Sequence, residues 1–169
     1  LGLVLFADRV LEEHRPRPGR AQLFRILRAI LGHTVPWQRP VANSDPRAAI
    51  HAVEKRRGHF AVFLISDLID HDVPEDLRYL RDRHDVTLLH VYDPLEYADP
   101  GGAAPVRLQA RASEGGAAAV PVALGAGETL EGAQTWLRQR CGALRMDYAS
   151  IPTTQPARHA LGPLFHRRR

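Results

Sequence analysis

An apolar segment that ends in acidic residues constrains the fold of this chain more than any other feature. Residues 59–72 read HFAVFLISDLIDHD, so six apolar residues, 60–65, are followed by Ser66 and Asp67. An unbroken apolar run of this length is typical of a strand that is covered on both faces of a parallel sheet. In such sheets, ligands bind beyond the carboxyl ends of the strands. The segment therefore predicts an α/β fold with a candidate site beside Asp67.

Other predicted strands alternate with predicted helices along the chain. The remaining strands are predicted at 1–6, 86–92 and 144–149, and the helices at 20–31, 46–57, 72–83, 128–141 and from about 155 onward. The apolar residues at 23, 24, 27, 30 and 31 form a helical stripe of the kind that faces a core. Strand, helix and strand joined by short links indicate parallel βαβ units. We therefore expect the four strands to lie parallel in one sheet, with residues 7–19 adding an edge strand and its exit loop.

The length and charge of the chain limit the classes of function to consider. Its 169 residues suit a single domain over 1–169. No apolar stretch approaches the roughly 18 residues that a membrane span needs, so we expect no membrane segment. The net charge is +4, but aromatic residues are not interleaved with the basic ones, so we expect no nucleic-acid partner.

The sequence lacks the motifs of common catalytic and cofactor sites. It contains no P-loop, no nucleophile elbow, no HExxH and no paired CxxC. The stretch GAGETLEG, at 125–132, has Leu130 where a dinucleotide fingerprint needs its third glycine. The single cysteine, Cys141, is expected to be a small helix residue without a redox role. The chain is therefore predicted to be non-enzymatic and to bind no organic cofactor.

Two residues are candidate ligands of a metal ion. Asp67 either accepts backbone N–H bonds in a turn or binds Mg²⁺, which prefers oxygen ligands and needs only one or two protein carboxylates. Ser44 either caps the helix that begins near Pro46, a task that Asp45 could also perform, or directs its hydroxyl at a metal beside Asp67. For Asp93, a role in fixing the turn before Pro94 is preferred to a ligand role.

Several segments resemble a known bacterial family. LGLVLFADRV, AQLFRILRAIL, SDPRAAI, FAVFLISDLID and RHDVTLLHVYDPLE follow one another over roughly residues 1–100. Together they resemble the von Willebrand factor A-like family called domain of unknown function 58. The end of the chain, GALRMDYASIPTTQPARHALGPLFHRR, is similar to the last strand and helix of that family.

The resemblance implies a fold and an incomplete metal site. The fold would be a doubly wound, mainly parallel sheet with helices on both faces. The metal-ion-dependent adhesion site of such domains has three motifs, of which Ser44 would match the second and Asp67 the third. The chain opens inside an apolar run at Leu1, and the first motif, Asp-x-Ser-x-Ser, would lie before it. We therefore expect an N-terminally truncated domain that lacks its first central strand, is marginally stable, and binds either no cofactor or Mg²⁺ no tighter than millimolar.

The same resemblance implies a partner. The chain would be an interaction module that acts beside a MoxR-type AAA+ ATPase in assembling or activating protein complexes. Its location would be cytoplasmic, although the parent protein could be membrane-anchored. The alternative is a small metal-dependent α/β hydrolase in which Asp67, together with Asp93, holds Mg²⁺ and activates water.

Overall fold

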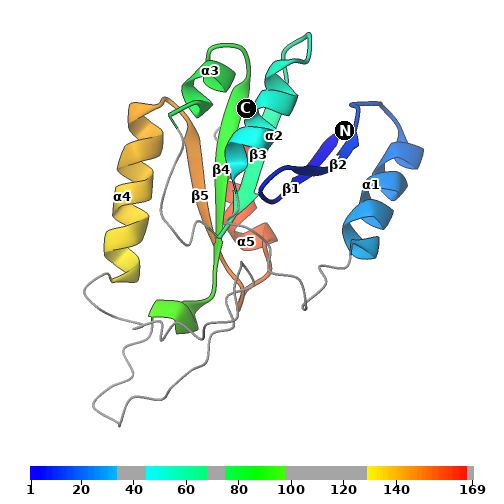
Figure 1. Ribbon diagram of the computed structural model, residues 1–169. Helices are drawn as coiled ribbons and strands as arrows, with labels where there is room; N and C mark the ends of the chain where they lie inside the picture. Colours follow the sequence, from blue (N-terminus) through cyan, green and yellow to red (C-terminus); the bar gives the residue numbers. More distant parts are fainter. Residues whose placement is uncertain (34–44, 68–74, 98–128, 167–169) are drawn as a thin grey trace. The chain divides into compact units, whose positions relative to one another are not determined.

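The structure is a computed structural model that describes residues 1–33, 45–67, 75–97 and 129–166 (Figure 1). These residues divide into two compact units. The first unit contains residues 1–33 and 45–57, and the second contains 58–67, 75–97 and 129–166. The expectation that residues 1–169 form one domain stays a prediction.

The first unit is built on a β-hairpin. Strand β1 (Leu3–Phe6) pairs antiparallel with β2 (Val10–His14), with Leu3 opposite His14 and an irregularity between Leu5 and Phe6. The connection has only three residues, which permits antiparallel pairing, whereas a parallel pair needs a crossover of about a dozen residues or more. The hairpin forms its own two-stranded sheet. In the described structure, residues 1–6 do not join the sheet of the other predicted strands, so the prediction of one sheet is wrong for this strand, and the predicted edge strand after it is confirmed.

Two helices complete the first unit, α1 (Arg20–Gly32) and α2 (Pro46–Glu54). The Asp45 carboxylate accepts a 2.9 Å hydrogen bond from the Arg47 backbone N–H and caps α2, so the cap is Asp45. Ala49 and Ile50 form the buried face of α2, as their spacing predicts. Because Asp45 also donates its backbone N–H to the Ala7 carbonyl, the start of α2 is fixed to the hairpin turn.

The second unit contains a parallel three-stranded sheet. Its strands are β3 (Ala61–Ser66), β4 (Asp85–Tyr92) and β5 (Asp147–Pro152), with β4 in the middle. The other elements are α3 (Leu77–Arg81), the 3₁₀ helix η1 (Pro94–Tyr97), α4 (Leu130–Ala143) and α5 (Arg158–His166). Five consecutive residues of β4, 86–90, are buried, so the predicted burial of this strand and the parallel pairing of β3, β4 and β5 are confirmed.

Helices cover both faces of this sheet. Ser150 and Ile151 are neighbours on β5 and therefore point to opposite faces. Gln134 of α4 donates a 3.0 Å hydrogen bond to the Ser150 hydroxyl, whereas Leu164 of α5 packs with Ile151 and Leu89. Figure 1 shows α4 beside β5. The second unit is thus a mixed α/β layer structure whose core lies on both sides of β4.

Some boundaries and exposures differ from the sequence-based expectations. β3 is an edge strand of the described sheet, and its Phe63 and Ile65 are exposed, so its apolar run does not indicate cover on both faces. The helix predicted at 72–83 begins outside the described residues, and the described helix α3 begins at Leu77. On α4, Trp136 is 43% exposed, whereas Cys141 is buried.

A Schellman motif delays the start of β5. The Met146 N–H bonds to the Cys141 carbonyl and the Arg145 N–H to the Gly142 carbonyl, while Arg145 takes a φ of 55°. These residues therefore complete α4, and β5 begins at Asp147 rather than at 144. Among the described helices, none is both long enough and apolar enough to span a membrane.

Candidate functional site

The carboxyl edge of the three-stranded sheet is the first candidate site. Ser66 ends β3 and is in register with His90 of β4, which in turn is in register with Ser150 of β5. Asp67 follows Ser66 and is exposed. Residues in register across a parallel sheet face the same side. Three polar side chains therefore line one face of the sheet at the edge where Asp67 lies, as the topology predicts.

A polar network joins two strands and α4 on this face. Nδ1 of His90 lies 3.2 Å from the Tyr148 hydroxyl oxygen, and the side-chain amide of Gln134 donates to the Ser150 hydroxyl. The rings of His90 and Tyr92 stack with their centroids 5.4 Å apart. This network was not predicted from the sequence. The sequence feature that could have predicted it is the alternation of polar residues in the two strands, His90 and Tyr92 in β4 and Tyr148 and Ser150 in β5.

The electrostatics of the network favour a structural role. His90 is fully buried. Burial raises the pKa of the Tyr148 phenol, and its hydrogen bond to Ser150 opposes that change. The Arg138 guanidinium, 5.9 Å from the ring centroid of Tyr148, also lowers this pKa. The network therefore joins β4, β5 and α4 through the fully buried His90 and the half-buried Tyr148 and Ser150.

The structure describes Asp67 but not Ser44, the other predicted metal ligand. Ser44 lies outside the described residues, so the pairing of Ser44 with Asp67 stays a prediction. Asp93 accepts a 3.0 Å hydrogen bond from the Leu95 backbone N–H, which is the expected turn-fixing role. Within the described ranges, no three His, Cys, Asp or Glu side chains gather as they would to hold a metal ion.

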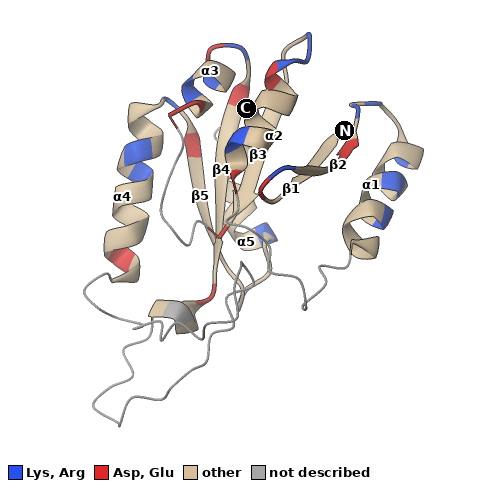
Figure 2. Ribbon diagram, viewed as in Figure 1, with Lys and Arg blue, Asp and Glu red and all other residues tan. Residues whose placement is uncertain are grey.

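The second candidate is a surface on α1, in the first unit. Five large apolar side chains of this helix are between 43 and 84% exposed, and we call them the apolar row: Leu23, Phe24, Leu27, Ile30 and Leu31. The buried residues of α1 are instead Gln22, whose amide donates to the Arg15 carbonyl, and Ile26. The expectation that the stripe faces a core is therefore wrong within this unit. In Figure 2, α1 carries basic residues and no acidic ones.

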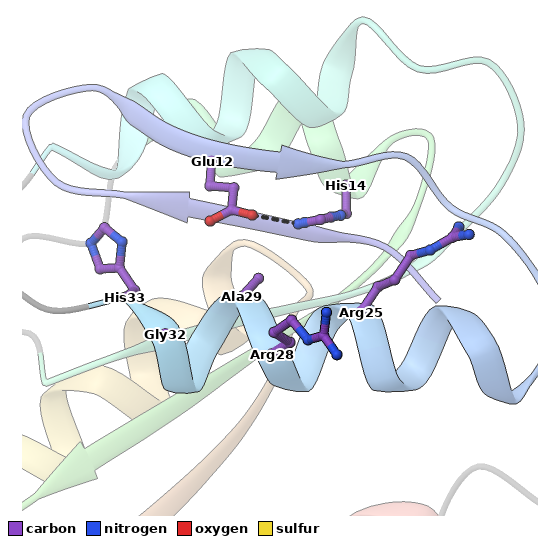
Figure 3. Close-up of a pocket in the computed structure, with 7 residues that line it drawn as sticks. All are labelled: Glu12, His14, Arg25, Arg28, Ala29, Gly32 and His33. Carbon is purple, nitrogen blue, oxygen red and sulfur yellow. Dashed lines mark hydrogen bonds and ion pairs between the residues drawn. The ribbon is translucent and has the colours of Figure 1, made fainter.

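A pocket of about 370 Å³ lies between β2 and α1 (Figure 3). Glu12 and His14 enter it from the same face of β2, with Oε1 of Glu12 2.6 Å from Nε2 of His14. Arg25 and Arg28 border it from α1, and Ala29 and Gly32 form its small-residue floor. The described lining therefore has two guanidinium groups and one carboxylate, and that carboxylate already has a partner.

One comparison with known proteins identifies a family. The family model described as "Protein of unknown function DUF58" matches residues 1–119, more than half of the chain. The chain belongs to the DUF58 family. The match takes in the α1 surface, and at the sheet edge it takes in Ser66, Asp67 and His90. The described elements α4, β5 and α5 follow the matched residues.

The other comparisons add no relatives of the DUF58 chain. No curated protein matches it, and no solved structure does. The likeness of residues 142–168 to the last strand and helix of the family stays a prediction.

Proposed function

We propose that this DUF58 chain is a non-enzymatic protein-interaction module that acts in the cytoplasm with a MoxR-type AAA+ ATPase. In this role it assists the assembly or activation of other protein complexes. The observation that carries the proposal is the apolar row of α1. Soluble domains seldom expose large apolar residues in a contiguous group unless the group meets a partner.

We also propose that the fold is von Willebrand A-like, with a doubly wound sheet. The parallel order β3, β4, β5 and the placement of α4 and α5 on opposite faces support this proposal. In that fold, the carboxyl edge beside Asp67 would be the place for a degenerate metal-ion-dependent adhesion site that also includes Ser44.

The experiment mixes the purified chain with a purified MoxR-type AAA+ ATPase. We expect a complex in size-exclusion chromatography with light scattering, and a change in the rate of ATP turnover on addition of the chain. The absence of both would contradict the proposal.

The alternative hydrolase makes a different prediction for the chain alone. It would release phosphate from a phosphoester in the presence of Mg²⁺, and Asp67→Asn would abolish this activity. Asp82→Asn, at another exposed acid, is the matched control and would retain it. Activity with this pattern, without ATPase binding, would replace the interaction module by the hydrolase.

A further inference from the structure

We propose that the pocket between β2 and α1 binds a small phosphate monoester with a neutral, hydroxyl-bearing organic part, such as a sugar phosphate. The inference goes beyond the proposed function, because it adds a small-molecule site to the interaction module and does not depend on the identity of the protein partner. The apolar row of α1 lies on the other flank of the helix and takes no part in this site.

One wall of the pocket is a single face of α1. Its helical residues follow one another at spacings of three, one and three and therefore share one side of the helix: Arg25, Arg28, Ala29 and Gly32 (Figure 3). Ala29 and Gly32 carry little side chain, and a Cβ added at Gly32 would meet nothing within 4 Å. The small residues therefore leave open space, and the two arginines border it.

The charge of the lining favours an anion. Among the residues that the structure describes, no carboxylate lies within ion-pair distance of Arg25 or Arg28. Glu12, the one acid of the described lining, has its Oε1 2.6 Å from Nε2 of His14. Residues 15–33 contain five arginines and no Asp or Glu. An anion in the pocket would therefore meet two guanidinium groups, while the Glu12 carboxylate is already held by His14.

Two guanidinium groups one helical turn apart suit a phosphate better than a carboxylate. A single guanidinium occupies both oxygens of a carboxylate through two parallel hydrogen bonds. A phosphate monoester has three terminal oxygens and carries about 1.5 to 2 negative charges at pH 7. It would therefore accept hydrogen bonds from Arg25 and Arg28 at once.

The end of α1 sets the direction in which such a ligand would lie. The helix ends at Gly32, and the carbonyl groups of a last helical turn lack intrahelical partners and carry partial negative charge. These carbonyl groups repel a phosphate but accept hydrogen bonds from hydroxyl groups. We therefore expect the phosphate beside Arg25 and Arg28, and the hydroxyl-bearing part beside Ala29 and Gly32.

The size of the pocket favours a small molecule. Its volume of about 370 Å³ lies near the lower end of the range for small-molecule pockets, roughly 300–1,000 Å³. Phosphopeptides and anionic lipids offer the same phosphate group attached to a much larger body, which a space of this size does not enclose.

Nuclear magnetic resonance titration of the whole chain tests the class of ligand. Glucose 6-phosphate should shift the backbone amide signals of residues 12–14 and 25–33 in a saturable manner. Glucuronate, which has a carboxylate on the same sugar ring, should bind at least about tenfold more weakly, and glucose should not bind measurably. Inorganic phosphate should bind more weakly than glucose 6-phosphate, because it lacks the hydroxyl-bearing part.

The charge of the pocket is tested by one pair of variants. Arg28→Gln should weaken the binding of glucose 6-phosphate at least about tenfold, because it removes hydrogen bonds to a charged group. Arg20→Gln is the matched control, since Arg20 is an exposed arginine of α1 outside the pocket lining, and this variant should bind as the unmodified chain does.

The open space is tested separately, by a second pair of variants. Gly32→Leu fills the space without changing any charge, so it should abolish binding. Its unfolding midpoint by circular dichroism should be no lower than that of the unmodified chain, because glycine is a poor helix former. Gly142→Leu is the matched control at an exposed glycine of α4 whose surroundings are equally open, and it should leave binding unchanged.

Each contrary outcome overturns the inference. Equal binding of glucose 6-phosphate and inorganic phosphate would show an adventitious ion only. A loss in Arg20→Gln as large as that in Arg28→Gln, or unchanged binding by Gly32→Leu, would show general attraction to a basic helix rather than a pocket. If a phosphoserine peptide or phosphatidic acid vesicles bind through Arg28 while glucose 6-phosphate does not, the pocket belongs to a protein or lipid phosphate.

Discussion

The imidazole of His90 and the phenol of Tyr148 lie with Nδ1 and the hydroxyl oxygen 3.2 Å apart and their rings inclined by 29°. His90 is on the central strand and Tyr148 on its neighbour β5. Because His90 is fully buried, its polar atoms depend on partners inside the protein. The pair therefore fixes β5 against β4 at the edge of the sheet where the candidate site lies.

Removal of this hydroxyl should destabilise the second unit. Tyr148→Phe keeps the ring but leaves the buried Nδ1 of His90 without that hydrogen bond, at a cost of about 1–3 kcal/mol in the free energy of unfolding. Urea denaturation followed by circular dichroism measures the change. Tyr79→Phe is the control, because Tyr79 is 47% exposed and should change the free energy by less than about 0.5 kcal/mol. Equal effects of the two substitutions would mean that the hydrogen bond to His90 does not contribute measurably to the free energy of unfolding.

Much of the second unit could be predicted from local sequence patterns. Residues 86–92 are mostly apolar and favour a strand, and the links to the neighbouring helices are short. This pattern predicts both the burial of the strand and its parallel pairing. The sheet to which β1 belongs was mispredicted, because an apolar run shows that a strand forms but not which sheet it joins. In this case, the three-residue connection to β2 decided the pairing.

The candidate sites were predicted less completely for a related reason. The position of Asp67 follows from chain order alone, since it comes directly after a strand. The contacts of His90 with Tyr148, and of Gln134 with Ser150, depend on the register of β5 and the placement of α4. A helical stripe such as that of α1 shows that one face is apolar, but not what covers it.

Acidification should weaken the second unit through His84. This side chain is 1% exposed, and in the described structure neither ring nitrogen has a hydrogen-bond partner. Burial lowers the pKa of His84, and the charges of Arg83 and His59 lower it further. The unfolded chain therefore takes up a proton near the ordinary pKa of about 6.5, whereas the folded chain does so only at lower pH. Stability should fall as the pH drops below about 6.5 and level off below the folded-state pKa.

The melting temperature as a function of pH measures this effect. His84→Leu should flatten the profile between neutral pH and the folded-state pKa, since it removes the titrating group. His159→Gln replaces an exposed histidine and should leave the profile as it is. A profile that His84→Leu does not change would mean that other groups control the acid sensitivity.

Arg145 should be replaceable by glycine with a gain in stability. It occupies the position of the Schellman motif that glycine usually takes, with a φ of 55°. The left-handed conformation costs a residue with a Cβ about 1–2 kcal/mol, a cost that glycine avoids. Part of this gain is offset, because glycine gives the unfolded chain more conformational freedom. Arg145→Gly should therefore raise the free energy of unfolding by about 0.5–1 kcal/mol.

The side chain of Arg145 is exposed, and its carbonyl, which accepts a 2.6 Å hydrogen bond from Nε of Arg81, remains in the variant. Arg145→Ala is the control, because it removes the charge but keeps the Cβ, and it should give no such gain. Equal stabilisation by alanine would attribute the effect to the lost charge rather than to the backbone.

The thiol of Cys141 should be unreactive until α4 opens. Cys141 is fully buried on the inner face of α4, and burial raises its pKa to about 11, against the smaller opposing effect of Arg140. The thiolate is the reactive form, so at mildly alkaline pH both access and ionisation oppose alkylation. Iodoacetamide should label the native chain slowly, at a rate set by opening of the second unit, and label the urea-unfolded chain rapidly.

In a Cys141→Ala background, Ala143→Cys supplies an exposed thiol two residues away as the comparison and should react quickly in the folded protein. Rapid labelling of native Cys141 at the rate of that comparison thiol would show that α4 does not hold its inner face against the sheet.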